Sequence, residues 1–150
     1  MNAKQVMKYM MAGGLFLSLA AGALAEAAEG SREMAMRKIM KGLGGNMQTV
    51  TGAISAEDWQ LVEKTAPLIA DHPQPSMSEK LRIIAFIGTD MGKFKGYDSK
   101  VHETADSLGK AAKAKDGEAV ISAFKEIQTA CYGCHKEFRS QFLQHFYGTR

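Results

Sequence analysis

The only two cysteines of the chain, Cys131 and Cys134, are three residues apart, and His135 follows directly. Two thiols and an imidazole could form a redox pair, half of a zinc site, a plain disulfide, or the Cys-x-x-Cys-His attachment point of a c-type haem. On a helix, residues three and four positions apart are neighbours, so all three side chains would point broadly the same way. That arrangement suits one planar ligand, held by two thioethers and reached at its iron by the histidine.

Two of the competing interpretations, the zinc site and the thioredoxin-like redox pair, need features that this sequence does not offer. A structural zinc site needs four ligands, and the other histidines, His72, His102 and His145, are not at a zinc-finger spacing. A thioredoxin-like pair is expected in a βαβ context and at a helix start. A disulfide between the two cysteines is compatible with an oxidising compartment and stays an alternative. We therefore favour a single covalent haem c.

The first 25 residues are typical of a cleaved signal peptide. Lys4 and Lys8 precede an apolar run that ends in Ala23-Leu24-Ala25, a small-x-small cleavage pattern. An uncleaved anchor is the alternative, but the run of residues 9–25 is short for a membrane span. We expect cleavage after Ala25, a mature domain of residues 26–150 in the periplasm, and no stable membrane span.

The mature chain has almost no net charge. Cleavage removes two of the 19 basic side chains and none of the 16 acidic ones, which leaves a net charge of +1. Without a basic excess we expect no nucleic-acid partner.

The periodicity of apolar residues predicts an all-α chain. In the first helix, residues 31–54, apolar side chains recur at steps of four and three, as bundle helices need. Gly42, Gly44 and Gly45 within it indicate either a bulky group near the backbone, or local fraying or a kink. A second helix is expected after Ser55 as its N-cap, kinked or split at Pro67 and ended by residues 71–75.

The second half of the chain is expected to add two long helices. Residues 78–88 suit a short helix capped by Ser78, although a strand would also fit, and residues 88–98 read as a glycine-rich loop. Asp98 is expected to cap a helix over 99–115, and the turn at Asp116-Gly117 precedes a last helix over 118–145 that carries the cysteines. The simplest fold is an antiparallel four-helix bundle.

A low-spin haem needs a sixth iron ligand, commonly His or Met. The first helix is rich in methionine, at Met34, Met36, Met40 and Met47. Methionine at helical spacing is also ordinary core filler, so the spacing does not choose between the two roles.

These residues resemble the cytochrome c′ family, which comprises exported four-helix bundles with haem c on the last helix. The attachment motif is followed by Phe138 and Arg139, and residues 40–47, MKGLGGNM, are similar to the family's first-helix segment. The resemblance covers residues 30–140. It implies that Met40 occupies the distal ligand position, with Met36 as a second candidate, and that Arg139 lies near the proximal histidine.

The chain also departs from the family's pattern. Met36 stands where an arginine is common, with Arg37 displaced by one, and the tail SQFLQHFYGTR is longer and more aromatic than usual. The resemblance also makes a homodimer plausible.

Two functions are compatible with the sequence. The first is a low-spin electron carrier, ligated by Met40 and His135, that exchanges electrons with redox partner proteins and catalyses no reaction. The second is a high-spin, five-coordinate cytochrome c′ that binds nitric oxide or carbon monoxide, with Met40 only packing over the iron. We expect the first.

Overall fold

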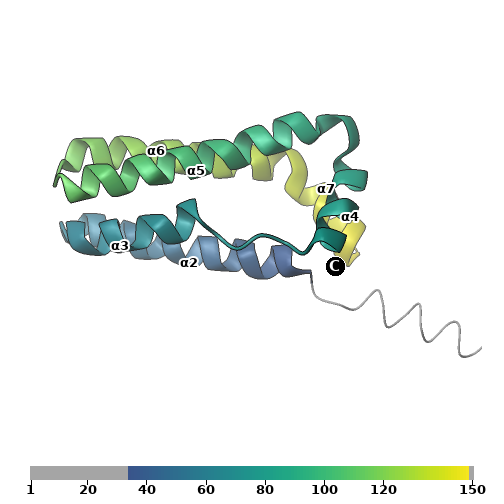
Figure 1. The fold of residues 1–150 in the computed structure, drawn as a ribbon, viewed down its shortest axis with the longest axis horizontal. Coiled ribbons are helices and arrows are strands. Elements are labelled where there is room, and N and C mark those ends of the chain that lie inside the picture. The colour runs from purple at the N-terminus through teal and green to yellow at the C-terminus, as the bar shows by residue number, and fades with distance from the viewer. Residues whose placement is uncertain (1–33, 149–150) are drawn as a thin grey trace, which may run out of the picture. The chain divides into compact units, whose positions relative to one another are not determined.

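A computed structural model describes residues 34–148, and this part of the chain is helical without a β-strand (Figure 1). The predicted signal peptide and its cleavage site lie outside the described residues. The elements are α2 (Ala35–Ser55), α3 (Trp59–Ala70), α4 (Met77–Ile87), the 3₁₀ turn η1 (Gly88–Asp90), α5 (Met91–Lys113), α6 (Gly117–Cys134), the π-helical segment η2 (His135–Arg139) and α7 (Ser140–Tyr147).

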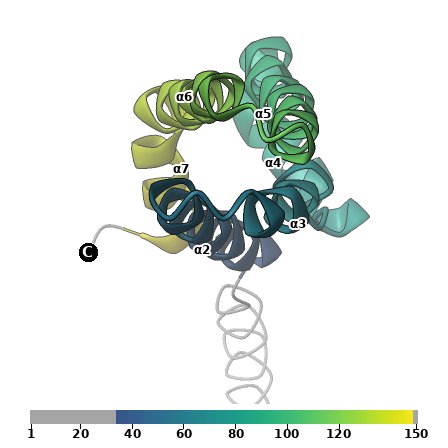
Figure 2. The same cartoon turned by 90° about the vertical axis from the view of Figure 1, so that its left-hand side faces the viewer.

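Four long helices, α2, α3, α5 and α6, form the predicted four-helix bundle. Helix α3 packs against α2 and α5, and α5 packs against α6, whereas α2 and α6 touch each other little. Figure 2 views the bundle end-on and shows the four helices arranged around one axis. The all-α, four-helix-bundle prediction is confirmed. None of the helices within residues 34–148 is long and apolar enough to cross a bilayer.

The tightly packed core fills one part of the bundle. Val50, Val62, Leu108, Val120 and Ile127 are fully buried, each from the apolar stripe of a long helix. Their neighbours in the core come from residues 47–53, 62–70, 101–112 and 120–130. The remaining length of α2, α5 and α6 therefore carries inward-facing side chains that this core does not use.

Two predicted helix starts are wrong by a few residues because a different polar side chain caps each helix. Ser55 is the last residue of α2, and its hydroxyl donates to the Thr51 carbonyl. Asp58 caps α3 by accepting from the Leu61 N–H at 3.0 Å. Ser76, rather than Ser78, accepts from the Glu79 N–H at the start of α4. Helix α3 also runs through Pro67 without being split.

The prediction of a glycine-rich loop over residues 88–98 is wrong. After η1, helix α5 begins at Met91, so Asp98 lies within the helix and does not cap it. The glycines Gly92 and Gly96 are exposed, whereas Phe94 and Tyr97 make tertiary contacts. Packing of these aromatic rings stabilises a helix that the glycines alone disfavour.

The last predicted helix is built from three consecutive helical pieces. Asp116 caps α6 by accepting from the Ala119 N–H, and α6 passes into η2 at His135 and then into α7. The aromatic tail packs around Phe86 of α4, whose ring lies 5.8 Å from Phe142 and 5.3 Å from Phe146. The tail therefore joins the last helix to α4 at one end of the bundle.

Candidate functional site: a cavity between α2 and α6

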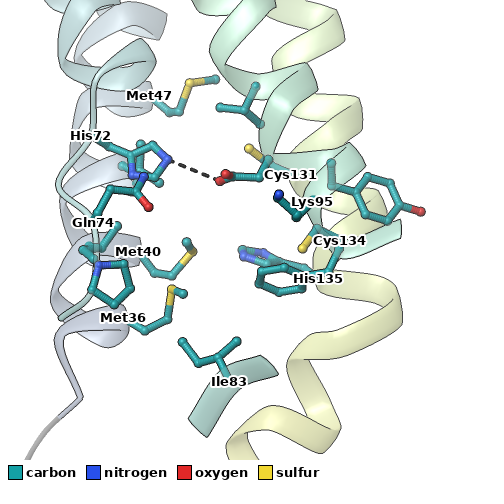
Figure 3. Close-up of a pocket in the computed structure, with 18 of the residues that line it drawn as sticks. Met36, Met40, Met47, His72, Gln74, Ile83, Lys95, Cys131, Cys134 and His135 are labelled. Atoms are coloured by element: carbon teal, nitrogen blue, oxygen red, sulfur yellow. Dashed lines mark ion pairs between the residues drawn. The ribbon is translucent and has the colours of Figure 1, made fainter. Parts of the chain in front are cut away.

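A cavity of about 870 Å³ lies where the tightly packed core ends. Side chains of α2, α4, α5 and α6 and of the segment after α3 line it, and Figure 3 shows that the labelled residues face one another across it. Its volume falls within the ~300–1,000 Å³ typical of small-molecule and cofactor sites. The bundle thus holds open a space large enough for one organic cofactor.

Cys131 and Cys134 lie on the cavity wall formed by the end of α6 (Figure 3). Both thiols are free and half-buried. Burial raises the pKa of both thiols, and the pKa of Cys134 rises to about 11, mainly through burial and then through the nearby Cys131, Asp98 and Glu137. The wall therefore presents two neutral thiols, one helical turn apart, to whatever occupies the cavity.

His135 follows as the first residue of η2 and also points into the cavity (Figure 3). Burial, and then the positive charge of Arg139, lowers the pKa of this imidazole. A lowered pKa favours the neutral ring, which is the form that binds metals. The π-helical geometry widens the turn at the histidine, and such segments are frequent at functional sites.

Contacts with α5 hold the motif in place. The Tyr97 hydroxyl donates to Glu137 Oε2 at 3.3 Å, and Lys93 forms an ion pair with the other oxygen of the same carboxylate. The ring of Phe94 packs edge-on against Phe138, with the ring centres 5.4 Å apart. Segment η2 is thus fixed to α5 directly beside His135.

Met36 and Met40 face the motif from α2. Figure 3 shows both side chains directed across the cavity toward His135. Met40 is 39% exposed although it belongs to the inward side of a bundle helix. An occupant of the cavity would cover this apolar surface. Both methionines that are candidates for the distal position are therefore at the cavity, on the wall opposite His135.

The glycines of α2 do not interrupt the helix. A side chain added at Gly42, Gly44 or Gly45 would meet no atom within 4 Å, and Gly44 lines the cavity. The fraying alternative is not borne out, because α2 runs unbroken from Ala35 to Ser55. Space beside Gly44 agrees with the alternative of a bulky group near this backbone.

Arg139 does not line the cavity in the described structure. Its side chain is exposed, and its charge acts on His135 from one turn further along the chain. Arg37, the arginine displaced from the family's usual position, lies over the Tyr147 ring at 3.8 Å. Neither arginine is in the position expected for a direct contact with a cavity ligand.

Three polar residues at the cavity, His72, Lys95 and Asp98, are missed by sequence reasoning. Lys95 points inward (Figure 3) and offers a cation to an anionic group in the cavity. Asp98 lies four residues before His102, a spacing that marks one helix face. That signal is lost when Asp98 is assigned to a loop end instead of a helix interior.

A sequence comparison bears directly on the cavity. A family model described as Cytochrome C' matches residues 30–139, which include both walls and the whole Cys-x-x-Cys-His segment. The chain belongs to the cytochrome c′ family. No curated protein matches this chain. The match ends at Arg139, so α7 and its aromatic tail lie beyond the part shared with cytochrome c′.

The cytochrome c′ family implies a c-type haem, and the residues of the cavity fit one. Two thiols and an imidazole share one wall, thioether side chains face them, and the walls between are largely apolar. Cys131 and Cys134 would hold the haem, His135 would bind its iron, and Lys95 would neutralise an anionic substituent. The donor set of the cavity thus fits the haem that the family implies.

Proposed function

We propose that this cytochrome c′ family member is an exported, periplasmic electron carrier with one covalent haem. In this proposal Cys131 and Cys134 are the thioether anchors, His135 is the proximal ligand and Met40 is the distal ligand. The observation that carries it is the direction of Met40, which points from α2 at His135 across the cavity. The haem supplies a one-electron iron couple, and methionine ligation raises its reduction potential.

The surrounding chain would hold the two ligands at a fixed separation. Glu79 of α4 accepts from the Ala35 and Met36 N–H groups at 2.9 and 2.8 Å, which anchors the first turn of α2. Tyr97 and Lys93 anchor η2 on the opposite wall. Two ligands on well-anchored helices need little movement when iron changes its oxidation state. We propose no catalysed reaction, because this role needs none.

Redox proteins that donate or accept one electron are the proposed partners. A net charge of +1 after signal cleavage gives little long-range steering, so short-range contacts would select the partner. A homodimer and the absence of a nucleic-acid partner or stable membrane span belong to the same proposal. Export is supported by the signal-like residues 1–25, which also bring the chain to a compartment where haem c is attached.

The ferric protein's electron paramagnetic resonance and optical spectra test the distal ligand. We expect a low-spin wild type, a low-spin Met36→Ala variant and a high-spin Met40→Ala variant whose reduction potential is lower. Met36→Ala is the matched control, because both side chains point at His135 from the same helix. Loss of the low-spin signal in Met36→Ala alone would assign the ligand to Met36.

A high-spin wild type would contradict the electron carrier and support the gas-binding alternative. Methionine has three rotatable bonds and adapts to irregular space, so Met40 packing beside an open iron is the physical basis of that alternative. Carbon monoxide binding to the ferrous protein would then be the next measurement. Covalent attachment is checked separately, since haem that leaves the chain on denaturation would contradict the proposed thioethers.

A further inference from the structure

His72, Asp98 and His102 form a cluster on the wall of the haem cavity. His72 lies just after α3, and Asp98 and His102 are one turn apart on α5. The His72 Nε2 atom lies 3.4 Å from Asp98 Oδ1, and the His102 Nε2 atom lies 3.5 Å from Asp98 Oδ2. One ligand atom from each residue lies within 4.8 Å of the others. Figure 3 draws the His72 contact as a dashed line.

Backbone carbonyls set which ring nitrogen of His72 and of His102 carries the proton that is donated to the backbone. The His72 Nδ1 atom lies 3.0 Å from the Pro73 carbonyl oxygen, and the His102 Nδ1 atom contacts the Ala70 carbonyl oxygen. A carbonyl oxygen only accepts, so each Nδ1 must donate its proton to it. In a neutral ring this leaves Nε2 with a lone pair. Hydrogen bonds of this kind orient the histidine ligands of metal sites.

With Nδ1 as the donor, the two Nε2 atoms and the Asp98 carboxylate are the atoms left to bind a cation. Both Nε2 atoms approach the carboxylate of Asp98, and the rings stack with their centres 4.7 Å apart. The His72 side chain is 7% exposed and the Asp98 side chain 47%, so the cluster is buried at His72 and open to solvent at Asp98. A cation shared by the three groups would accept an electron pair from each of them.

The donor set selects the class of cation. Two imidazole nitrogens and one carboxylate suit Zn²⁺ and its transition-metal neighbours. Tetrahedral Zn²⁺ with bonds of ~2.0–2.1 Å places its ligand atoms about 3.4 Å apart. The two nitrogen–oxygen distances of the cluster, 3.4 and 3.5 Å, already match this separation. All three ligand atoms lie within 4.8 Å of one another, so a small tilt of the stacked rings would suffice to reach tetrahedral separations.

We propose that His72, Asp98 and His102 bind one divalent transition-metal ion, with Zn²⁺ as the reference ion, at a site separate from the haem iron. The Asp98 side chain is 47% exposed, which leaves a route for the ion and room for a water as the fourth ligand. His72 and Asp98 also line the haem cavity. A dication there would stabilise the reduced haem and raise its reduction potential.

Zinc binding to the chelator-treated holoprotein tests the site by titration calorimetry at pH 7.5. We expect one equivalent of Zn²⁺ to bind, and Asp98→Asn and His102→Gln each to weaken binding by at least about ten-fold. Glu103→Gln makes the same change of charge beside His102 on an exposed position, and His145→Gln removes an imidazole elsewhere; both should bind like wild type.

Asp98 and His102 are the residues to substitute because both side chains are partly exposed, whereas substitution of the buried His72 could disturb folding. An unchanged haem spectrum in each variant verifies the fold. The proposal would be overturned if the wild type failed to bind one equivalent of Zn²⁺. It would also be overturned if Asp98→Asn and His102→Gln bound Zn²⁺ as tightly as the wild type. The haem's spin state does not enter this test, so its outcome is distinguishable from that of the electron-carrier proposal.

Discussion

Gly133, between the two cysteines, leaves no room for a side chain. A Cβ atom added there would lie 2.6 Å from Cε1 of Tyr97, closer than carbon atoms approach in proteins. The same tyrosine donates to Glu137 and thereby fixes η2 beside His135. A glycine at this position lets Tyr97 lie against the helix that carries the haem motif.

Gly133→Ala should therefore destabilise the holoprotein although alanine is the better helix former. We expect a loss of about 1–3 kcal/mol in the free energy of unfolding, the usual cost of overpacking, measured by urea denaturation. Gly45→Ala is the matched control, because nothing lies within 4 Å of its added Cβ; it should raise stability by up to ~1 kcal/mol. Equal effects of the two substitutions would contradict the contact with Tyr97.

The first turn of α2 depends on a side chain from another helix. No acidic residue lies in this turn, and Glu79 of α4 instead accepts from two of its N–H groups. Helix starts leave several N–H groups without partners, so this carboxylate does the work of an N-cap from a distance. Because Met36 belongs to that turn, α4 helps to position the cavity wall that α2 forms.

Glu79→Ala should lower the free energy of unfolding by about 1 kcal/mol, as loss of a helix cap does. It should also perturb the ferric spectrum, since the turn that carries Met36 loses its anchor. Glu79→Gln keeps one acceptor oxygen and should show a smaller loss by thermal unfolding. A stability loss with no spectral change would show that other contacts position the cavity wall that α2 forms.

At the scale of the whole molecule, the bundle has a packed part and a hollow part. Fully buried Val50, Val62, Leu108, Val120 and Ile127 stabilise the first, whereas the second surrounds the 870 Å³ cavity. Apolar side chains along these walls gain contact atoms when an occupant fills the space. The haem would supply them, and its two thioethers would tie it to α6.

Removal of the attachment should therefore loosen the molecule. We expect a Cys131→Ser/Cys134→Ser variant to bind haem less firmly, to lose helical circular dichroism and to unfold over a broader temperature range. Cys131→Ser alone keeps one thioether and should be intermediate. A haem-free chain with full helix content and a sharp cooperative transition would contradict the structural role of the haem.

The sequence places Cys131, Cys134 and His135 together because the signal is local. Cys131, Cys134 and His135 lie within five consecutive residues, so a single helix brings them to one face whatever the rest of the chain does. Met40 reaches the same cavity because its apolar stripe fixes which side of α2 faces the bundle. The Cys-x-x-Cys-His motif was identified by its spacing, whereas Met40 was identified by resemblance to the family's pattern.

Local signals also explain the errors. Gly92 and Gly96 favour a loop, and only the tertiary packing of Phe94 and Tyr97 makes their segment the start of α5. Ser55 and Ser78 are good caps by type, but Asp58 and Ser76 lie where the helices begin. Intrinsic helix propensity contributes little free energy per residue, so tertiary packing and neighbouring capping residues outweigh it.

By itself the sequence determined the helical class, the bundle and the haem-attachment motif, because each follows from periodicity or from residues close together in the chain. Tertiary structure alone decided which side chains meet across the cavity. It sets Met36 and Met40 opposite His135, leaves Arg139 off the cavity wall, packs the tail on α4, and brings His72 to Asp98 and His102. Those encounters join distant segments, and only the packed bundle sets their distances.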